Sequence, residues 1–471
     1  MNTFWLKIAG LAVLVVGLII LVSVFLPSGP QPVEQPESER EVKEVGDSDL
    51  RPQPKVKPQV EGVPNPKVDY VAKINELARA GRDETLNAAP FYQKAIDLLV
   101  GSEPARTRAW PADLSAKQQS LLRQWVQSNS QALSQLELGA KKPYYWLQRS
   151  SPDGSVMGIS LPGLAEFRQL GFAITWRAKL NAAQGNNDKA MKNILTCYRF
   201  GLHQIGPKTL VEQLVGIAIR ALAVRTAFII LDRTEMSQAS MKSLQRQIKQ
   251  LSTDESYIPD MRAEKVSMLD IIQRTFTDDG KGDGRILTSA ETLSMISDYT
   301  TLTQEEIRSF PKLRRRQTTE TVEKLYEHLD FVVQKTPWQW KNEQIDPEKE
   351  IEKIMEGNPF VQIFCPAFVR VTQIFAQRKA ETDALITTLA LFRYKADKGQ
   401  IPEKLDELVS AGYLKALPTD PFSGSPFVYK RLGGDFMLYS FGTDCDDDGG
   451  THNRRWDKDD QVFWPVQQTN R

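Results

Sequence analysis

The stretch ALFRYKADKGQIP, Ala390 to Pro402, marks the place where the chain changes from one kind of structure to another. Before it, apolar residues recur at three- and four-residue steps, which is the period of an amphipathic helix. Gly399 stands where a helix C-cap would stand, and Pro402 follows it. Beyond it come turn residues and short alternating runs, which are typical of strands. The sequence therefore predicts a mainly α protein that ends in a small unit containing strands.

The C-terminal unit, residues 376–471, is predicted to be a small α+β module. Glu403 to Ser410 have the pattern of a short helix that Gly412 ends. The runs FVYKR and DFMLYS then alternate as strands do, and Gly433-Gly434 joins them. A two-residue Gly-Gly link between such runs is a good hairpin signal. We therefore expect an antiparallel sheet followed by acidic loops.

Residues 67–375 are predicted to form a large domain of antiparallel helices. One helix-turn-helix is expected around the turn Gly185-Asn186-Asn187-Asp188, with Ala178, Ala182 and Ala190 allowing close packing. The spacing of its helices is similar to that of a tetratricopeptide repeat, but no 34-residue period is sustained over three copies. The sequence is therefore compatible with an ordinary helix bundle and with a peptide-binding repeat surface. The apolar run from Leu214 to Leu231 contains Arg220 and Arg225, which favours a buried helix over a membrane span.

The N-terminal part of the chain predicts a membrane anchor and a tether. Residues 8–26 are nineteen residues without a charge, enough to cross a bilayer as a helix, and they are longer than the usual core of a cleaved signal peptide. Residues 27–66 hold nine prolines among polar residues, which predicts a disordered, extended linker. We expect residues 1–7 in the cytoplasm and a single-pass protein of the inner (cytoplasmic) membrane, with its C-terminal bulk extracytoplasmic.

Composition narrows the kinds of chemistry that the chain can carry. The formal net charge is +1, from 60 basic and 59 acidic residues, so no global field favours nucleic acid as a partner. The three cysteines form no CxxC pair and there are only three histidines, which argues against zinc and against chemistry that needs several imidazoles. No nucleophile elbow, P-loop or HExxH motif is present. We therefore predict that the protein is not an enzyme.

The stretch SFGTDCDDDGG, Ser440 to Gly450, places four aspartates in five residues directly after the second predicted strand. Ca²⁺ takes six to eight oxygen ligands and mixes carboxylates with carbonyls, which a loop of Asp and Gly supplies. A solvated acidic turn is the other interpretation. We call residues 440–450 the acidic loop.

Three motifs in this region resemble those of the major pseudopilins of type II secretion systems. They are ALFRYKADKGQIP (390–402), LPTDPFSGSPFVY (417–429) and DFMLYSFGTD (435–444). The resemblance implies a calcium site made by Asp444, Asp460 and the carbonyl oxygen of Phe441. The acidic loop and the residues THNRRWDK after it are longer than the family pattern, so Asp446 and Asp448, and also Asp447, Asp457 and Asp459, are candidates to replace or supplement these ligands.

The N-terminus departs from the pseudopilin pattern. Pseudopilins have a cleavable leader that ends in Gly and is followed by Phe, with a glutamate a few residues later in the apolar helix. MNTFWLKIAGLAV has neither the Gly-Phe junction nor the glutamate. About 350 residues also separate the anchor from the C-terminal module. This chain is therefore not expected to be processed or packed as an ordinary filament subunit.

Two further charged segments have a functional and a structural interpretation each. TDDGKGDGRIL, from Thr277 to Leu287, is similar to an EF-hand loop, but Lys281 and Ala290 stand where calcium ligands should be, so a helix connector is the alternative. The basic run KLRRR, residues 312–316, could contact phosphate or acidic lipid, or form a solvated helix face.

Together these features predict a membrane-anchored extracytoplasmic interaction or assembly protein with a calcium-stabilised C-terminal module, associated with a type II secretion or pilus-like system. Its expected partners are the membrane, through residues 8–26, and other proteins of the cell envelope. Two alternatives stay open: a cell-envelope hydrolase with its site in the helical domain, and a peptide-binding receptor built from helical repeats.

Overall fold

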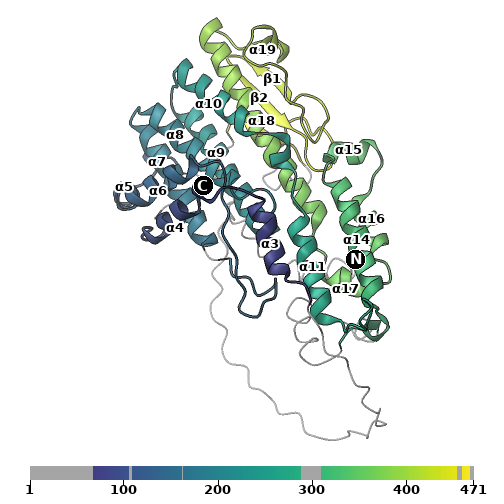
Figure 1. The fold of residues 1–471 in the computed structure, drawn as a ribbon. Coiled ribbons are helices and arrows are strands. Elements are labelled where there is room, and N and C mark those ends of the chain that lie inside the picture. Colours follow the sequence, from purple (N-terminus) through teal and green to yellow (C-terminus); the bar gives the residue numbers. More distant parts are fainter. Residues whose placement is uncertain (1–66, 105–108, 162, 288–308, 453–458, 467–471) are drawn as a thin grey trace, which may run out of the picture.

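The computed structural model describes residues 67–104, 109–161, 163–287, 309–452 and 459–466 (Figure 1). The anchor predicted at residues 8–26 and the linker predicted at residues 27–66 lie outside these ranges, and both stay predictions.

The described chain is mainly helical and carries one small sheet near its C-terminus, which confirms the predicted fold class at that level. The α-helices are α3 (Tyr70–Arg79), α4 (Ala89–Asp97), α5 (Ala116–Ser128), α6 (Ser130–Ala140), α7 (Leu164–Ala183), α8 (Asn187–Leu202), α9 (Leu210–Arg233), α10 (Gln238–Leu251), α11 (Arg262–Thr275), α14 (Arg315–Val332), α15 (Pro337–Asn342), α16 (Pro347–Ile354), α17 (Pro359–Phe364), α18 (Phe368–Lys398) and α19 (Asp406–Ser410). Short 3₁₀ turns lie at Glu84–Leu86, Pro111–Asp113, Asp254–Tyr257 and Phe310–Lys312.

The expected helix-turn-helix is present as α7 and α8, which pack against each other. The turn occupies residues 184–186, and the small residues Ala178, Ala182 and Ala190 are buried between the neighbouring helices. The structure therefore contains one such helix pair. A tetratricopeptide-like arrangement in part of the helical domain stays a prediction.

Helix α9 lies at the centre of the helical region and packs against α7, α8 and α18. By length and composition alone, α9 and the segment Pro359–Lys398 could each cross a membrane, but 89% of the apolar window of α9 is buried inside the protein. Its two interior arginines have partners, since Arg220 donates to the Ser256 carbonyl oxygen at 2.7 Å and Arg225 pairs with Glu381 at 2.9 Å. These contacts agree with the predicted buried helix.

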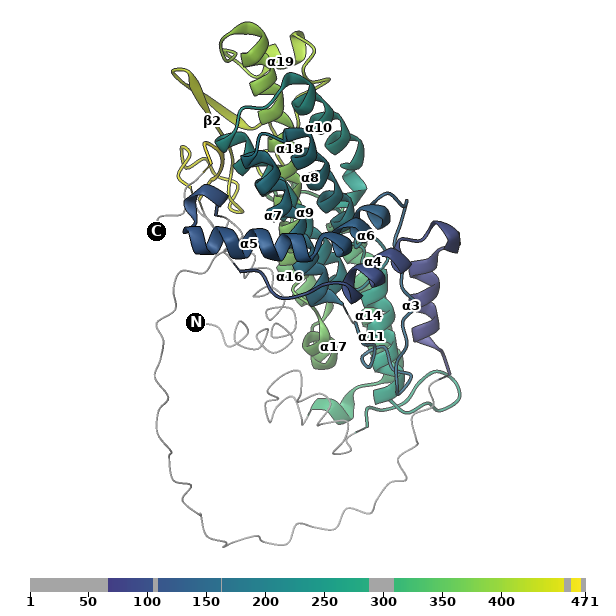
Figure 2. The same cartoon turned by 90° about the vertical axis from the view of Figure 1, so that its left-hand side faces the viewer.

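Helix α18 contributes to both hydrophobic cores of the molecule. Figure 1 shows it running diagonally from the sheet at the top toward α17, and Figure 2 shows α19 and β2 at the same end with α11, α14 and α17 at the other. Its first part, from Phe368 to Phe375, belongs to a core shared with the first turns of α9 and with α11, α14, α16 and α17. Its later part, from Ala376 to Tyr394, belongs to a second core shared with α4 to α10 and the sheet. The boundary expected between residues 375 and 376 thus falls inside one continuous helix.

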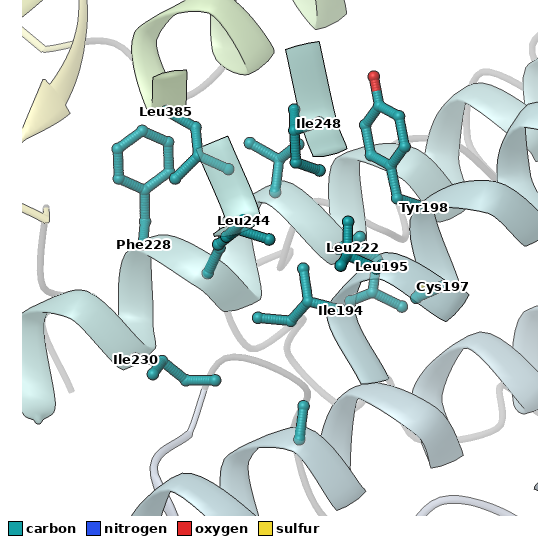
Figure 3. Close-up of a cluster of buried hydrophobic side chains, with 14 of the residues drawn as sticks. Ile194, Leu195, Cys197, Tyr198, Leu222, Phe228, Ile230, Leu244, Ile248 and Leu385 are labelled. Atoms are coloured by element: carbon teal, nitrogen blue, oxygen red, sulfur yellow. The ribbon is translucent and has the colours of Figure 1, made fainter. Parts of the chain in front are cut away.

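The second core is closely packed where α8, α9, α10 and α18 meet (Figure 3). Leu385 of α18 lies in this cluster with Phe228 of α9 and with Leu244 and Ile248 of α10. Leu385, Leu244 and Ile248 are fully buried.

The sheet has the strand order β1-β2-β3 and is antiparallel throughout, with β1 at Val428–Leu432, β2 at Asp435–Ser440 and β3 at Gln461–Trp464. Leu432 pairs with Asp435 across Gly433-Gly434, as the sequence predicts for a hairpin. The sheet packs on the end of α18 through Phe392, whose ring lies 4.9 Å from that of Trp464. This contact fixes the module on the helix.

We expect Leu385→Ala to lower the free energy of unfolding by about 2–5 kcal/mol, because it leaves a cavity in the core that α18 shares with α9 and α10. Urea denaturation of the purified full chain measures this loss. Leu432→Ala is the control, since Leu432 is 48% exposed on β1 and its truncation should change stability by about 0.5 kcal/mol or less. Equal effects of the two substitutions would contradict the role assigned to α18.

Candidate functional site

The acidic loop begins at the end of β2, where a buried carboxylate holds the strand. Asp420 is 1% exposed, and its Oδ1 accepts hydrogen bonds from the Ser440 hydroxyl at 2.7 Å and the Phe422 N–H at 3.1 Å. Its Oδ2 accepts a longer hydrogen bond from the Phe441 N–H, at 3.4 Å. Burial raises the pKa of Asp420 to about 6, although these hydrogen bonds act in the opposite direction. Asp420 thus fixes the position from which the loop departs.

The first half of the acidic loop is held by a lysine from the helical domain. Lys341, in the last turn of α15, donates to the carbonyl oxygens of Asp444 at 3.0 Å and Cys445 at 3.2 Å. It also pairs with Oδ1 of Asp446 at 2.6 Å, and this hydrogen bond raises the pKa of Lys341. One ammonium therefore binds three oxygens of the loop, in the manner of a small cation.

The same short helix contacts the turn that carries Asp420. The backbone N–H of Trp338 donates to the Pro421 carbonyl oxygen at 3.1 Å, and the Trp338 ring covers Gly424. A Cβ atom at Gly424 would lie 2.3–2.6 Å from three ring atoms of Trp338, and Gly424 has a φ of +66°. Glycine is needed there for both reasons. Trp338 and Lys341 together fasten α15 to the module.

The second half of the loop lies around Asp460, which directly precedes β3. Asp460 is fully buried, and its Oδ2 accepts a hydrogen bond from the Gly450 N–H at 2.7 Å. Its Oδ1 is buried and has no hydrogen-bond partner among the described residues. Burial raises the pKa of Asp460; backbone hydrogen bonds from Gly450 and Asp448 act to lower this pKa, and the nearby charges of Asp447 and Asp448 act to raise it. A buried, unpaired carboxylate oxygen beside other carboxylates is a feature that a bound cation would stabilise.

The structure places the five predicted ligands in different surroundings. The exposed Asp444 carboxylate accepts from the Asp446 N–H at 3.3 Å, the Asp446 carboxylate pairs with Lys341, and the Asp460 carboxylate accepts from the Gly450 N–H. The Phe441 carbonyl oxygen accepts from the Ser440 hydroxyl at 3.1 Å, and the side chain of Asp448 is exposed. Within the described ranges, no group of three or more His, Cys, Asp or Glu side chains is arranged to hold a metal ion.

Asp447, Asp457 and Asp459 are the remaining candidate ligands, and the structure describes only Asp447 and Asp459. Asp447 accepts hydrogen bonds from the Tyr439 hydroxyl and the Gly449 N–H, both at 2.9 Å. Asp459 lies next to the buried Asp460, and Asp457 lies outside the described residues. Asp460 is therefore the predicted ligand with the clearest spare acceptor.

The EF-hand-like loop and the basic run, which the sequence presents as separate features, contact each other. Asp283 pairs with Arg314 at 2.7 Å, and Asp278 pairs with Arg315 at 3.3 Å and Lys67 at 3.0 Å. Burial acts to raise the pKa of Asp283, but hydrogen bonds from Arg314 and from backbone N–H groups outweigh it and lower this pKa to about 2. These ion pairs attach the loop at 277–287 to the start of α14, so they give both segments a structural role.

Sequence reasoning missed Lys341, Trp338 and Asp420 as residues of this site. Asp420 lies inside the second pseudopilin-like motif, so its position next to a proline in that motif was a usable signal. Lys341 and Trp338 precede the loop by about a hundred residues, and nothing local in the sequence PWQWKN links them to it.

In comparisons with known proteins, the chain matches no family model, no curated protein and no solved structure. The resemblance to pseudopilins therefore depends on the motif residues themselves.

We expect Gly424→Ala to destabilise the protein by about 1–3 kcal/mol more than Gly433→Ala does, because only the former forces the Trp338 ring to move. Gly433 is the matched control: its φ is +62°, and a Cβ there would meet nothing within 4 Å. Both substitutions pay the same backbone cost, so the difference in unfolding free energy reports the α15 contact. Equal losses would show that Trp338 does not hold the turn.

The raised pKa of Asp420 predicts a pH dependence of stability. The folded state binds the Asp420 proton more tightly than the unfolded state does, so this group costs stability above pH 6 and the cost disappears as pH falls from about 6 toward 4. We expect the stability of the wild type, measured relative to Asp420→Asn, to rise as the pH falls over that range. Urea unfolding of both proteins at several pH values measures the difference, and a constant difference would contradict the raised pKa.

Proposed function

We propose that the protein is a membrane-anchored, extracytoplasmic interaction or assembly protein of the cell envelope. In this proposal residues 8–26 cross the inner membrane, residues 27–66 act as a tether, and the folded part works by binding other envelope proteins. Its C-terminal module would be stabilised by calcium and would connect the protein to a type II secretion or pilus-like system. No catalytic role is proposed.

The observation that carries this proposal is the burial of α18 inside its own chain. A subunit of a filament needs an apolar helix that is free to pack against other copies. Here Phe368, Val371 and Phe375 are buried against α11, α14 and α17, and Leu385 and Leu389 are buried in the second core. Because other helices of the same chain already cover α18, it is not free to pack against other copies. This favours a module that the helical domain holds in place over a module that forms a filament.

The calcium part of the proposal is supported by the chemistry of the acidic loop. Asp460 is buried with an unpaired oxygen, and it precedes the terminal strand as the pseudopilin resemblance requires. Asp444, Asp446, Asp448 and the carbonyl oxygen of Phe441 are the other candidate ligands, all from the loop after β2. When bound, calcium would supply the positive charge that offsets these carboxylates and would hold the loop against β3.

The test is to melt the purified full chain with calcium, with magnesium and with a chelator, by scanning calorimetry. We expect calcium to raise the melting temperature, because a ligand that binds only the folded state stabilises it by mass action. Asp460→Asn and Asp444→Asn should each reduce this rise. Since α18 belongs to both cores, body and module should melt in one transition that calcium shifts as a whole.

The control is Asp406→Asn, which removes one exposed charge from α19 of the same module and should leave the calcium effect intact. In chelator, Asp460→Asn should melt no lower than the wild type, since it removes a buried charge that Asp447 and Asp448 oppose. This separates loss of calcium binding from loss of folding. Identical melts with calcium and with chelator would overturn the metal site. Two separate transitions would overturn the expectation that the helical domain and the C-terminal module unfold together.

A further inference from the structure

A cavity of about 400 Å³ lies in the helical region, away from every residue discussed for the acidic loop. It is bounded by the segment that follows α6, by the end of α8 and by Leu251 at the end of α10. The basic side chains that line it are Arg82, Lys141, Lys142, Arg199 and His203. Tyr144 and Tyr145 provide aromatic walls.

These cations lack acidic partners. Among the described residues, no carboxylate lines the cavity, and none lies within 4.0 Å of the charged groups of the four Lys and Arg side chains. They are held instead by neutral contacts: Lys142 donates to the Thr85 carbonyl oxygen at 3.2 Å, and Arg199 to the Gln247 side-chain oxygen at 3.3 Å. Arg82 lies over the Tyr144 ring at 5.3 Å. The nearest acids that act on the lining are Asp83 and Glu84, whose charges add to burial in raising the pKa of Tyr144, so the four cations outnumber them at the cavity.

A buried second layer makes the wall of the cavity rigid and adds another basic group. The His203 ring is fixed on both sides, by the Tyr92 hydroxyl at 2.6 Å from Nδ1 and by the Lys142 carbonyl oxygen at 3.0 Å from Nε2. Lys208 is 1% exposed, lies over the Tyr145 ring at 4.8 Å, and donates to the His203 carbonyl oxygen.

Burial shapes the charge state of this layer. It lowers the pKa of His203 to about 3, so that ring is neutral, and it lowers the pKa of Lys208 to about 7. Glu212 acts to raise the Lys208 pKa, while Arg149 and Arg82 act to lower it further. An anion in the cavity would favour the charged form of Lys208.

We propose that this cavity is a binding site for a small ligand that carries two or more negative charges on oxygen, namely a phosphate compound or a polycarboxylate. Four cations that form no ion pair attract a multiply charged anion more strongly than a single carboxylate, and Lys and Arg donate charge-assisted hydrogen bonds to such oxygens. The concave shape and the volume suit a small molecule. The site is independent of the calcium proposal, because it uses none of the same residues.

The test is calorimetric titration of the purified full chain at low ionic strength with three probes: pyrophosphate, citrate and acetate. We expect saturable binding of pyrophosphate or citrate, with acetate at least about tenfold weaker because a single charge gains less from the same cations. The affinity should fall steeply as salt is added. A preference for pyrophosphate would assign the site to phosphate compounds, and a preference for citrate would assign it to polycarboxylates.

The double variant Lys141→Gln/Arg199→Gln should weaken binding of the preferred probe by about tenfold or more, since it removes two of the lining cations. Lys242→Gln/Arg246→Gln is the matched control, because it removes the same two charges from exposed positions on α10 that do not line the cavity. Thermal melting of both variants without ligand checks that each is folded. Absence of saturable binding, or an equal loss in the two variants, would overturn the proposal.

Discussion

The burial of α18 is the constraint on which the rest of the structure depends. Its 31 residues run from Phe368 to Lys398, and the side chains between Phe368 and Tyr394 supply apolar surface to both cores. This helix covers part of the apolar surface of α11, α14, α16 and α17 in one core and part of that of the small sheet in the other. Burial of apolar area on this scale outweighs the weak surface contacts around it. The module is therefore held in place by a core, and the contacts of α15 with the acidic loop and the turn at Gly424 add to this attachment.

The polar groups inside this core show why the arrangement is specific. Glu381 of α18 accepts Arg225 of α9 at 2.9 Å and Arg378 of its own helix at 2.7 Å. A buried charge that loses its partner is strongly unfavourable, so a shift of α18 along α9 would leave one of these groups uncompensated. Packing alone would tolerate such a shift more readily, since many neighbouring side chains are apolar. The charges set the register that the apolar residues stabilise.

How far the sequence could predict this structure depends on the sequence distance between the interacting residues. The helix end at Gly399, the Gly433-Gly434 hairpin and the α7–α8 turn all follow from local rules, and the structure has each of them. The clamp by Lys341 has no local signal, because its three oxygen partners lie 103 to 105 residues away. The loop at 277–287 and the basic run at 312–316 were both visible as charged segments. Their pairing was not, because each has many possible partners until the fold brings them together.

The basic cavity illustrates the same limit for function. Arg82, Lys142, Arg199 and His203 are unremarkable one by one, and they come from separate segments between residues 82 and 203. Net charge gives no hint of them, since 60 basic residues are balanced by 59 acidic ones. What makes the cavity distinctive is the local absence of acids among its described lining residues, which is a property of tertiary structure alone. Because dissolved salt screens the field of exposed charges beyond about 8 Å at physiological ionic strength, a ligand would experience this potential only at the cavity itself. Recognition there must depend on direct contacts with the lining residues, so the number and placement of charges on the ligand would decide affinity.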